Sequence, residues 1–216
     1  MPKRVDHTER RTEIAEALLR VAARRGLHAV GMRDVAAEAG VSLRLVQYYF
    51  ETKEKLLLYG LQHLAERFGQ RATARLRDAG PRPGPRAMIE AILTAALPTD
   101  EESRTFHLVY TSYAILSVTD RALADQPFIH NPDAAESALT RLLRQAQESE
   151  LLQPGVDVEL EAVGLLALSA GLGTSILVGQ RGPESAAAVL DHCLKRVFRD
   201  RSPGVPVRAR GVQEEE

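Results

Sequence analysis

The chain has 216 residues, of which 44% are hydrophobic, and its formal net charge at pH 7 is -1. This length allows a sizeable core and more than one structural unit. Its single cysteine, Cys193, excludes an internal disulfide framework and a cysteine-based zinc site. We therefore expect a cytoplasmic protein without a metal or other cofactor.

The first predicted helix covers residues 8–25. Apolar residues recur in it at three- and four-residue spacing, from Ile14 through Leu18 to Ala22, and Gly26 ends the pattern. The first 55 residues hold 11 Lys and Arg against 8 Asp and Glu, whereas the remainder holds 17 against 21. This mild basic bias favours a nucleic-acid contact in the N-terminal part of the chain.

Residues 31–55 have the outline of a helix-turn-helix DNA-binding unit. Val35 lies on the apolar face of a first short helix, and Gly40 suits the left-handed conformation with which such a helix ends. Ser42 is placed to cap a second short helix that buries Val46 and exposes its other surface. The candidate DNA-reading residues on that surface are Leu43, Arg44, Leu45, Gln47 and Tyr48.

The rest of the chain is also predicted to be helical, because strand-type alternation is not sustained anywhere. Thr52 suits the N-cap of a long connecting helix over residues 53–78, and three prolines and two glycines make residues 80–85 a loop. Further helices are predicted over residues 86–97, 101–119, 131–150, 156–178 and 184–201. Glycine, serine and threonine interrupt the longest apolar run, so we expect no signal peptide and no membrane span.

The predicted fold class is therefore all-α, with about nine helices in two domains. Residues 1–52 form an N-terminal arm and a three-helix DNA-binding domain. Residues 53–201 are predicted to form a second, helical domain, and residues 202–216 a disordered tail.

Four short motifs resemble, in order and spacing, the DNA-binding signature of TetR-family transcriptional regulators. They are Arg33-Asp34-Val35-Ala36, Ala39-Gly40-Val41-Ser42, Tyr48-Tyr49-Phe50 and Thr52-Lys53-Glu54-Lys55-Leu56-Leu57. The match covers about residues 8–60. It implies an all-helical homodimer that joins a DNA reader to a domain for a small-molecule effector. The C-terminal domain offers no motif, so the resemblance leaves the effector open.

The resemblance also implies roles for single residues of the reader. Arg44 is the best candidate for base recognition, because its planar guanidinium can pair bidentately with guanine O6 and N7. Arg33 and Lys53 are expected to hold phosphates. The residues implied to face the major groove are Ser42, Leu43, Arg44 and Leu45, with Gln47 and Tyr48 toward the DNA backbone. An arm with Lys3, Arg4, Arg10 and Arg11 would reach an adjacent groove, unless it is a disordered charged tail.

Two positions depart from the family pattern. Gly31 stands where the family usually has Thr or Ser, and a glycine keeps much of the cap geometry but loses the hydroxyl contact to a phosphate. Gln47 stands where the family commonly has Tyr, and an amide can contact a phosphate or an adenine edge. The operator sequence therefore does not follow from the resemblance.

An aromatic stripe over residues 101–119, with polar tips, suits a small-molecule pocket. Because the sequence shows no obvious buried basic residue there, we expect an apolar, aromatic or cationic effector. Ordinary core packing explains each of these residues equally well. The candidate effector-binding residues are Phe68, Met88, Ile92, Phe106, His107, Tyr110, Tyr113, Leu139 and Leu143.

The two C-terminal helices have wide apolar faces with small residues that permit close helix approach. Such faces must be covered, and the family plan covers them with the same helices of a second subunit. The alternative is that they pack inside one protomer. The candidate dimer-interface residues are Gly164, Leu168, Gly171, Leu172, Ser175, Val189, Leu190 and Leu194.

The principal functional hypothesis is a ligand-responsive transcriptional regulator, in particular a repressor released from a palindromic double-stranded DNA operator. Two alternatives belong to other classes. One is a ligand-independent architectural DNA-binding protein. The other is an enzyme built on the C-terminal block, which has little support because the histidines are scattered and neither a His-Glu-x-x-His motif nor a nucleophile elbow is present.

Overall fold

The computed structural model describes residues 7–78, 82–119 and 131–199. Within these ranges the regular structure is helical, apart from one isolated β-bridge between Leu152 and Phe198. The all-α fold class is thereby confirmed. The residues of the arm before His7 and the predicted tail lie outside the described ranges.

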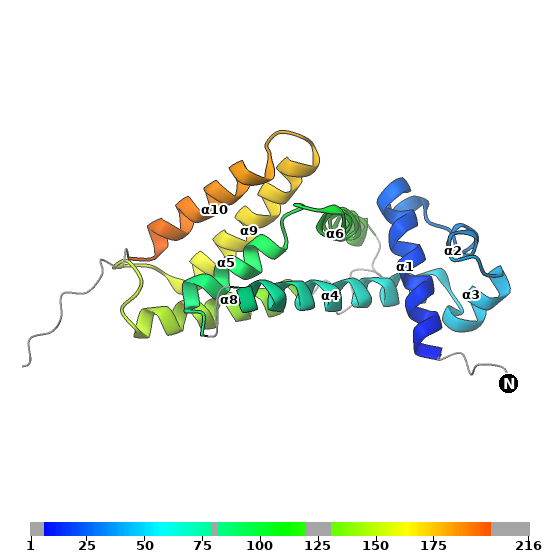
Figure 1. Ribbon diagram of the computed structural model, residues 1–216, viewed down its shortest axis with the longest axis horizontal. Helices are drawn as coiled ribbons and strands as arrows, with labels where there is room; N and C mark the ends of the chain where they lie inside the picture. The colour runs from blue at the N-terminus through cyan, green and yellow to red at the C-terminus, as the bar shows by residue number, and fades with distance from the viewer. Residues whose placement is uncertain (1–6, 79–81, 120–130, 200–216) are drawn as a thin grey trace, which may run out of the picture.

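The N-terminal helices gather at one end of the molecule (Figure 1). A short 3-10 turn, η1, follows the first helix over Leu27–Ala29. Helix α2 begins directly after Gly31, and Gly40 separates it from α3. We refer to the helices before α4 as the reader. They are α1 (His7–Arg25), α2 (Met32–Glu38) and α3 (Leu43–Phe50).

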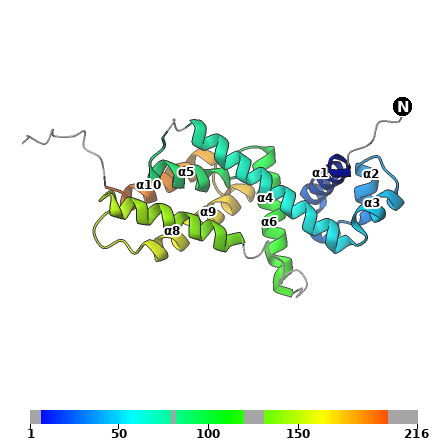
Figure 2. The ribbon, with the colours of Figure 1, turned by 90° about the horizontal axis from the view of Figure 1, so that it is seen from below.

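Helix α4 (Lys53–Asp78) leads out of the reader into the second domain, which we call the effector domain. Helix α6 crosses α4 between the reader and the other helices of this domain (Figure 2). The remaining helices lie at the far end of the molecule. The effector-domain helices after α4 are α5 (Pro85–Ala95), α6 (Glu101–Thr119), α8 (Asn131–Glu148), α9 (Val158–Leu177) and α10 (Pro183–Val197).

Two of the predicted helix ends are displaced for visible reasons. Helix α9 begins at Val158 because the carboxylate of Asp157 caps it, accepting hydrogen bonds from two backbone N–H groups at 3.1 Å. Helix α10 ends at Val197 and not at residue 201. There the chain turns to pair with an earlier segment, since the Arg199 N–H donates to the Leu151 carbonyl at 2.8 Å.

The buried apolar residues form two cores. The first joins α1, η1, α2, α3 and α4, and it also takes in Val109 and Tyr113 of α6. The second joins α5, α8, α9 and α10. Because α6 contributes to the first core, a helix of the effector domain is packed directly onto the reader.

Candidate nucleic-acid interface and effector region

The turn between α2 and α3 is held by local hydrogen bonds that the sequence predicts. The Ser42 hydroxyl accepts a hydrogen bond from the Leu45 N–H at 3.2 Å and so caps α3. Gly40 has a φ of 66°, which is the left-handed conformation expected at this turn. At the start of α2, Asp34 accepts from the Gly31 N–H at 3.2 Å, so part of the cap survives without a hydroxyl at Gly31.

Helix α3 divides its residues between core and solvent. Val46 and Phe50 are buried in the first core, while Arg44 and Gln47 are exposed and Tyr48 is 68% exposed. A short helix that buries so few side chains leaves the rest available to DNA. Among the other candidate DNA-binding residues, Arg33 and Ser42 are exposed and Leu43, Leu45 and Lys53 are half-buried.

An aromatic cluster joins the beginning of α1 to α3. The His7 ring lies 5.5 Å from the Tyr49 ring, and the Tyr49 ring lies 5.3 Å from the Tyr48 ring, between centroids. Sequence reasoning missed His7, because no local pattern indicates that the first turn of α1 meets α3. Nor does Arg11 extend into an arm, since its guanidinium lies 4.4 Å from the Tyr59 ring centroid.

The candidate effector-binding residues divide between the two cores. Phe68 stacks on Phe106 at 4.8 Å between ring centroids, and Phe106 stacks on Tyr110 at 5.9 Å. Tyr113, one helical turn further, is buried in the first core against the reader. The remaining apolar candidates, Met88, Ile92, Leu139 and Leu143, belong to or pack against the second core. The expected single pocket is therefore not lined by all of these residues in the described part of the chain.

His107 lies on a different side of α6 and contacts α9. Its Nε2 lies 3.3 Å from the Thr174 hydroxyl, and its ring lies against the backbone of Gly173, where a Cβ atom would be 2.2 Å from Cε1. Burial lowers the pKa of His107, so the ring is neutral at pH 7. This histidine therefore joins α6 to α9 as a packed, uncharged group.

A small cavity of about 10 Å³ adjoins the stacked aromatic rings. It has room for roughly one water molecule. Two arginines and an acid border it, which corrects the expectation that no basic residue lies near the aromatic stripe. The four-residue spacing of Arg67 and Arg71 places both on one face of α4, which the sequence could have indicated. Their acidic partners, however, lie in distant segments of the chain and leave no local signal. The lining residues are Leu64, Arg67, Phe68, Arg71, Ala95, Glu102, Ser103 and Phe106.

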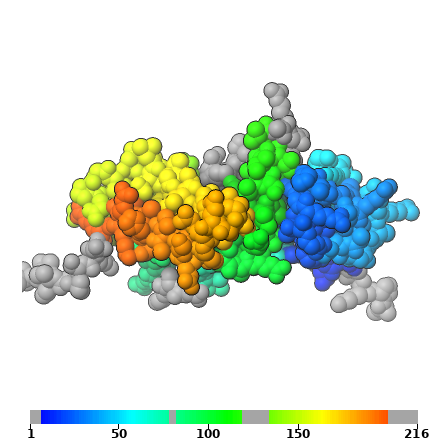
Figure 3. Space-filling view, turned by 90° about the horizontal axis from the view of Figure 1, so that it is seen from above, coloured from blue at the N-terminus to red at the C-terminus, as the bar shows by residue number. Residues whose placement is uncertain are grey.

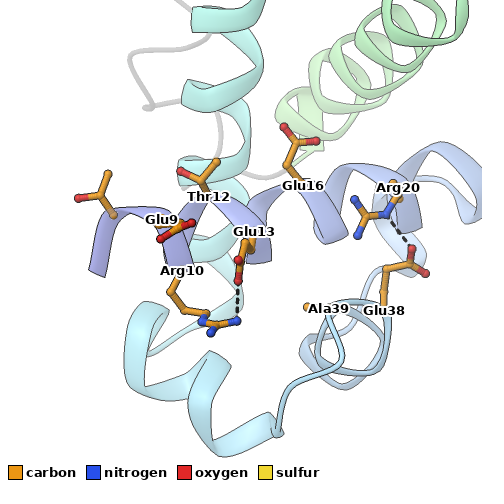
Figure 4. Close-up of a pocket in the computed structure, with 9 residues that line it drawn as sticks. Glu9, Arg10, Thr12, Glu13, Glu16, Arg20, Glu38 and Ala39 are labelled. Atoms are coloured by element: carbon orange, nitrogen blue, oxygen red, sulfur yellow. Dashed lines mark hydrogen bonds and ion pairs between the residues drawn. The ribbon is translucent and has the colours of Figure 1, made fainter. Parts of the chain in front are cut away.

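A much larger hollow of about 780 Å³ opens between α1 and the end of α2 (Figure 4). Ion pairs between Arg10 and Glu13 and between Arg20 and Glu38 lie along it. In Figure 4 the carboxylate of Glu16 points away from Glu13, to the other side of α1. The hollow is a charged surface of the reader and not an enclosed effector site.

The candidate dimer-interface residues fall into a buried set and a set that is exposed or half-buried. Leu172, Leu190 and Leu194 are buried in the second core of this chain, so their expected place on the dimer face is corrected. The apolar faces of α9 and α10 are wide enough for one side to pack inside the protomer. Gly164 and Gly171 are exposed, and Leu168, Ser175 and Val189 are half-buried.

A helix-turn-helix reader joined by one long helix to an all-helical domain defines a DNA-binding regulator with a built-in effector domain. The chain belongs to the TetR family of bacterial transcriptional regulators. Residues 14–59 match the family model for bacterial regulatory proteins of the tetR family. Residues 85–199 match the model for the C-terminal domain of BetI-type transcriptional repressors.

Relatives of known name agree with this assignment. The HTH-type transcriptional regulator PksA of Bacillus subtilis is 32% identical over 173 residues, covering 80% of each chain. The HTH-type transcriptional regulator BetI of Agrobacterium fabrum is 36% identical over 101 residues, covering 47% of this chain and 48% of its own. The chain is thus a ligand-responsive DNA-binding transcriptional regulator, and its family is not one of enzymes.

Solved structures share the fold over most of the chain. A putative TetR-family regulator from Rhodococcus sp. has a TM-score of 0.76 at 26% identity, covering 88% of this chain and 99% of its own. A putative transcriptional regulator from Saccharomonospora viridis, solved in complex with choline, has a TM-score of 0.79 at 24% identity, covering 89% of this chain and 100% of its own.

Proposed function

We propose that this regulator is a homodimeric repressor that binds a palindromic operator and leaves it when a small molecule occupies the effector domain. The observation that carries this proposal is the separation of two exposed surfaces. Helix α3, on which Tyr48 is 68% exposed, lies at one end of the molecule, and α9, on which Leu160 is 72% exposed, lies beyond α6 in the effector domain (Figure 1). Two copies joined through α9 would present two α3 helices to successive major grooves, about 34–36 Å apart.

The outward face of α9 has the properties expected of an interface with a second copy of the chain. Leu160 is 72% exposed and Val178 63% exposed, and Gly164, Ala167 and Gly171 between them allow close helix approach. By length and composition alone α9 is also apolar enough to cross a membrane. Because α10 packs beside α9 on the same side of the molecule (Figure 3), the two helices offer the broad face of a four-helix interface.

The charges beside the small cavity support a cationic or neutral effector. Three carboxylates, Glu16, Asp100 and Glu102, surround the two guanidinium groups of Arg67 and Arg71. Both guanidinium groups that line the cavity are thus already paired with carboxylates, which leaves neither free for an anionic effector, and the adjoining aromatic rings of Phe68 and Phe106 suit a cationic or neutral one. The choline complex of the Saccharomonospora neighbour fits the same chemistry. Another structural neighbour binds a different kind of ligand, because AibR was solved in complex with isovaleryl coenzyme A and operator DNA.

The DNA-binding and dimer proposals are tested together. Selection from random duplex DNA at fixed salt should enrich a palindrome, and light scattering should give a dimer at micromolar concentration. Ala167→Glu, on the outward face of α9, should give monomers with weakened operator binding, because it places charges in the interface. Ala74→Glu, at an exposed position of α4, is the matched control and should remain dimeric. A monomeric wild-type protein, or one with no preferred sequence, would refute the proposal.

The effector proposal is tested by titration calorimetry and by release of operator DNA. Choline, a neutral aromatic alcohol and isovaleryl coenzyme A serve as cationic, apolar and anionic probes. We expect the cation or the neutral compound to bind and to release the operator saturably. Preferential release by the anion would contradict the proposed class. Failure of any ligand to release DNA would instead favour a ligand-independent architectural protein.

A further inference from the structure

A chain of charged contacts crosses the boundary between the reader and the effector domain. It begins at Glu16, in the middle of α1. The Oε1 atom of Glu16 lies 2.7 Å from His63 Nε2 and 2.7 Å from Arg67 Nη1, both on α4. The reader is thus bonded to α4 well away from the turn that links them in sequence.

The same guanidinium also bonds the effector domain. Arg67 donates to Glu102, in the first turn of α6, at 2.8 Å. Arg71, one turn along α4, pairs with Asp100 and lies 3.9 Å from the second oxygen of Glu102. Arg67 therefore stands between a carboxylate of the reader and a carboxylate of the effector domain.

The two halves of the bridge differ in burial, because the side chain of Glu102 is 44% exposed and that of Glu16 is less so. The side chains of Glu16 and Arg67 are only 31% and 33% exposed. Burial opposes the charge of Glu16, but the hydrogen bond from His63 and the charge of Arg67 outweigh it and lower the pKa of this carboxyl. Since partly buried, hydrogen-bonded pairs are screened less than exposed ones, the pair between Glu16 and Arg67 is the more strongly held half of the bridge.

The chain of contacts also borders the small cavity at the aromatic rings. Arg67, Arg71 and Glu102 line this cavity together with Phe68 and Phe106. A molecule larger than water can enter only if these side chains move apart. Any such movement changes the contact between Arg67 and Glu102, and with it the hold of Arg67 on Glu16.

We propose that Arg67 is the positioning residue that couples effector occupancy to the reader, by bridging Glu102 of α6 to Glu16 of α1. In the effector-free protein the bridge holds α1 in the orientation that binds the operator. An effector in the cavity displaces Glu102 from Arg67, and the reader is released from that orientation. This inference rests on the proposed repressor function.

The bridge can be tested without knowing the effector, by a double-mutant cycle on operator affinity. Glu102→Gln removes one carboxylate far from DNA, and Glu16→Gln removes the other. Glu101→Gln is the control, because it makes the same charge change at the exposed neighbouring position of α6. Binding to the selected operator is measured by fluorescence anisotropy at fixed salt, and circular dichroism checks that each variant is folded.

We expect Glu102→Gln to weaken operator binding about 5-fold or more relative to Glu101→Gln, within the usual range of allosteric coupling. In the Glu16→Gln background, Glu102→Gln should have little further effect. Arg67→Lys keeps the charge but cannot bond Glu16 and Glu102 at once, so it should weaken operator binding to a similar extent. Additive losses from Glu16→Gln and Glu102→Gln, or a Glu102→Gln protein equal to its control, would overturn the inference. If the wild-type protein selects no operator, the proposed function itself fails first.

Discussion

Helices α3 and α6 both present aromatic and polar side chains, yet they use them differently. On α3, Val46 and Phe50 meet the needs of the core, so Arg44 and Tyr48 remain in solvent. On α6, Tyr113 is itself part of the core that holds the reader. An aromatic and polar stripe therefore indicates a binding surface only where other residues of the same helix already satisfy the core.

The largest expected effect comes from removing the aromatic side chain that α6 contributes to the reader core. Tyr113→Ala should lower the free energy of unfolding by about 3–5 kcal/mol, as for other large-to-small changes at buried aromatic positions. Ile115→Ala, on the same helix at a position 65% exposed, should change it by roughly 0.5 kcal/mol or less. Urea unfolding measures both. Equal effects would mean that Tyr113 faces a ligand site and not a core.

A second test concerns the contact between α6 and α9. Gly173→Ala would place a Cβ atom 2.2 Å from His107, so it should lower the free energy of unfolding by about 1–3 kcal/mol. His107→Ala in the same chain should recover part of this loss, because it removes the clashing ring. The control is Gly69→Ala, where a Cβ atom meets nothing within 4 Å and better helix propensity should give a small gain. A Gly173→Ala protein as stable as wild type would show that the two helices do not approach this closely.

On α3, Arg44→Ala should leave the stability of the protein nearly unchanged but reduce its discrimination between operator and random DNA. We expect a loss of about 1–3 kcal/mol in the difference between operator and random DNA, because a bidentate contact to guanine would be removed. Arg33→Ala is the contrasting variant, and it should weaken binding to both DNAs alike if Arg33 holds a phosphate. Equal losses on both DNAs for Arg44→Ala, at fixed salt, would reject base reading by this residue.

The smallest expected effect is a dependence of stability on pH. Burial lowers the pKa of His107 in the folded protein, whereas the unfolded chain takes up this proton near pH 6.5. The free energy of unfolding therefore decreases as the pH falls below about 6.5. The decrease ends once His107 is also protonated in the folded form. Urea unfolding at pH 7.5 and 5.5 should show a larger loss for wild type than for His107→Gln. An equal loss would mean that the ring is accessible to protons when folded.

Much of the reader could be predicted because its signals are local. The glycine at Gly40, the hydroxyl at Ser42 and the apolar spacing around Val46 act within a few residues, and each has the predicted conformation or burial. The effector domain could not be predicted in the same detail. Arg67 and Arg71 stood in the sequence without an indication of their partners, since Glu16 and Glu102 lie 51 and 35 residues from Arg67 in the chain.

The same limit applies to the apolar helices. Periodicity located α9 and α10, but both have more than one apolar side, so the spacing does not say which side faces inward. Packing decided that Leu172, Leu190 and Leu194 belong to the protomer core, and that Leu160 and Val178 are exposed. It also decided that His107 meets Gly173 and that α6 joins the reader core.

Helix periodicity, caps and turn residues are properties of neighbouring positions, so the all-α fold, the helix-turn-helix and the family can be predicted from the amino-acid sequence alone. The burial of individual side chains on α6 and α9, and the pairing of charges across α1, α4 and α6, follow from how the helices pack. These contacts join residues far apart in the chain, and their energies depend on burial and distance, which exist only once the helices have packed.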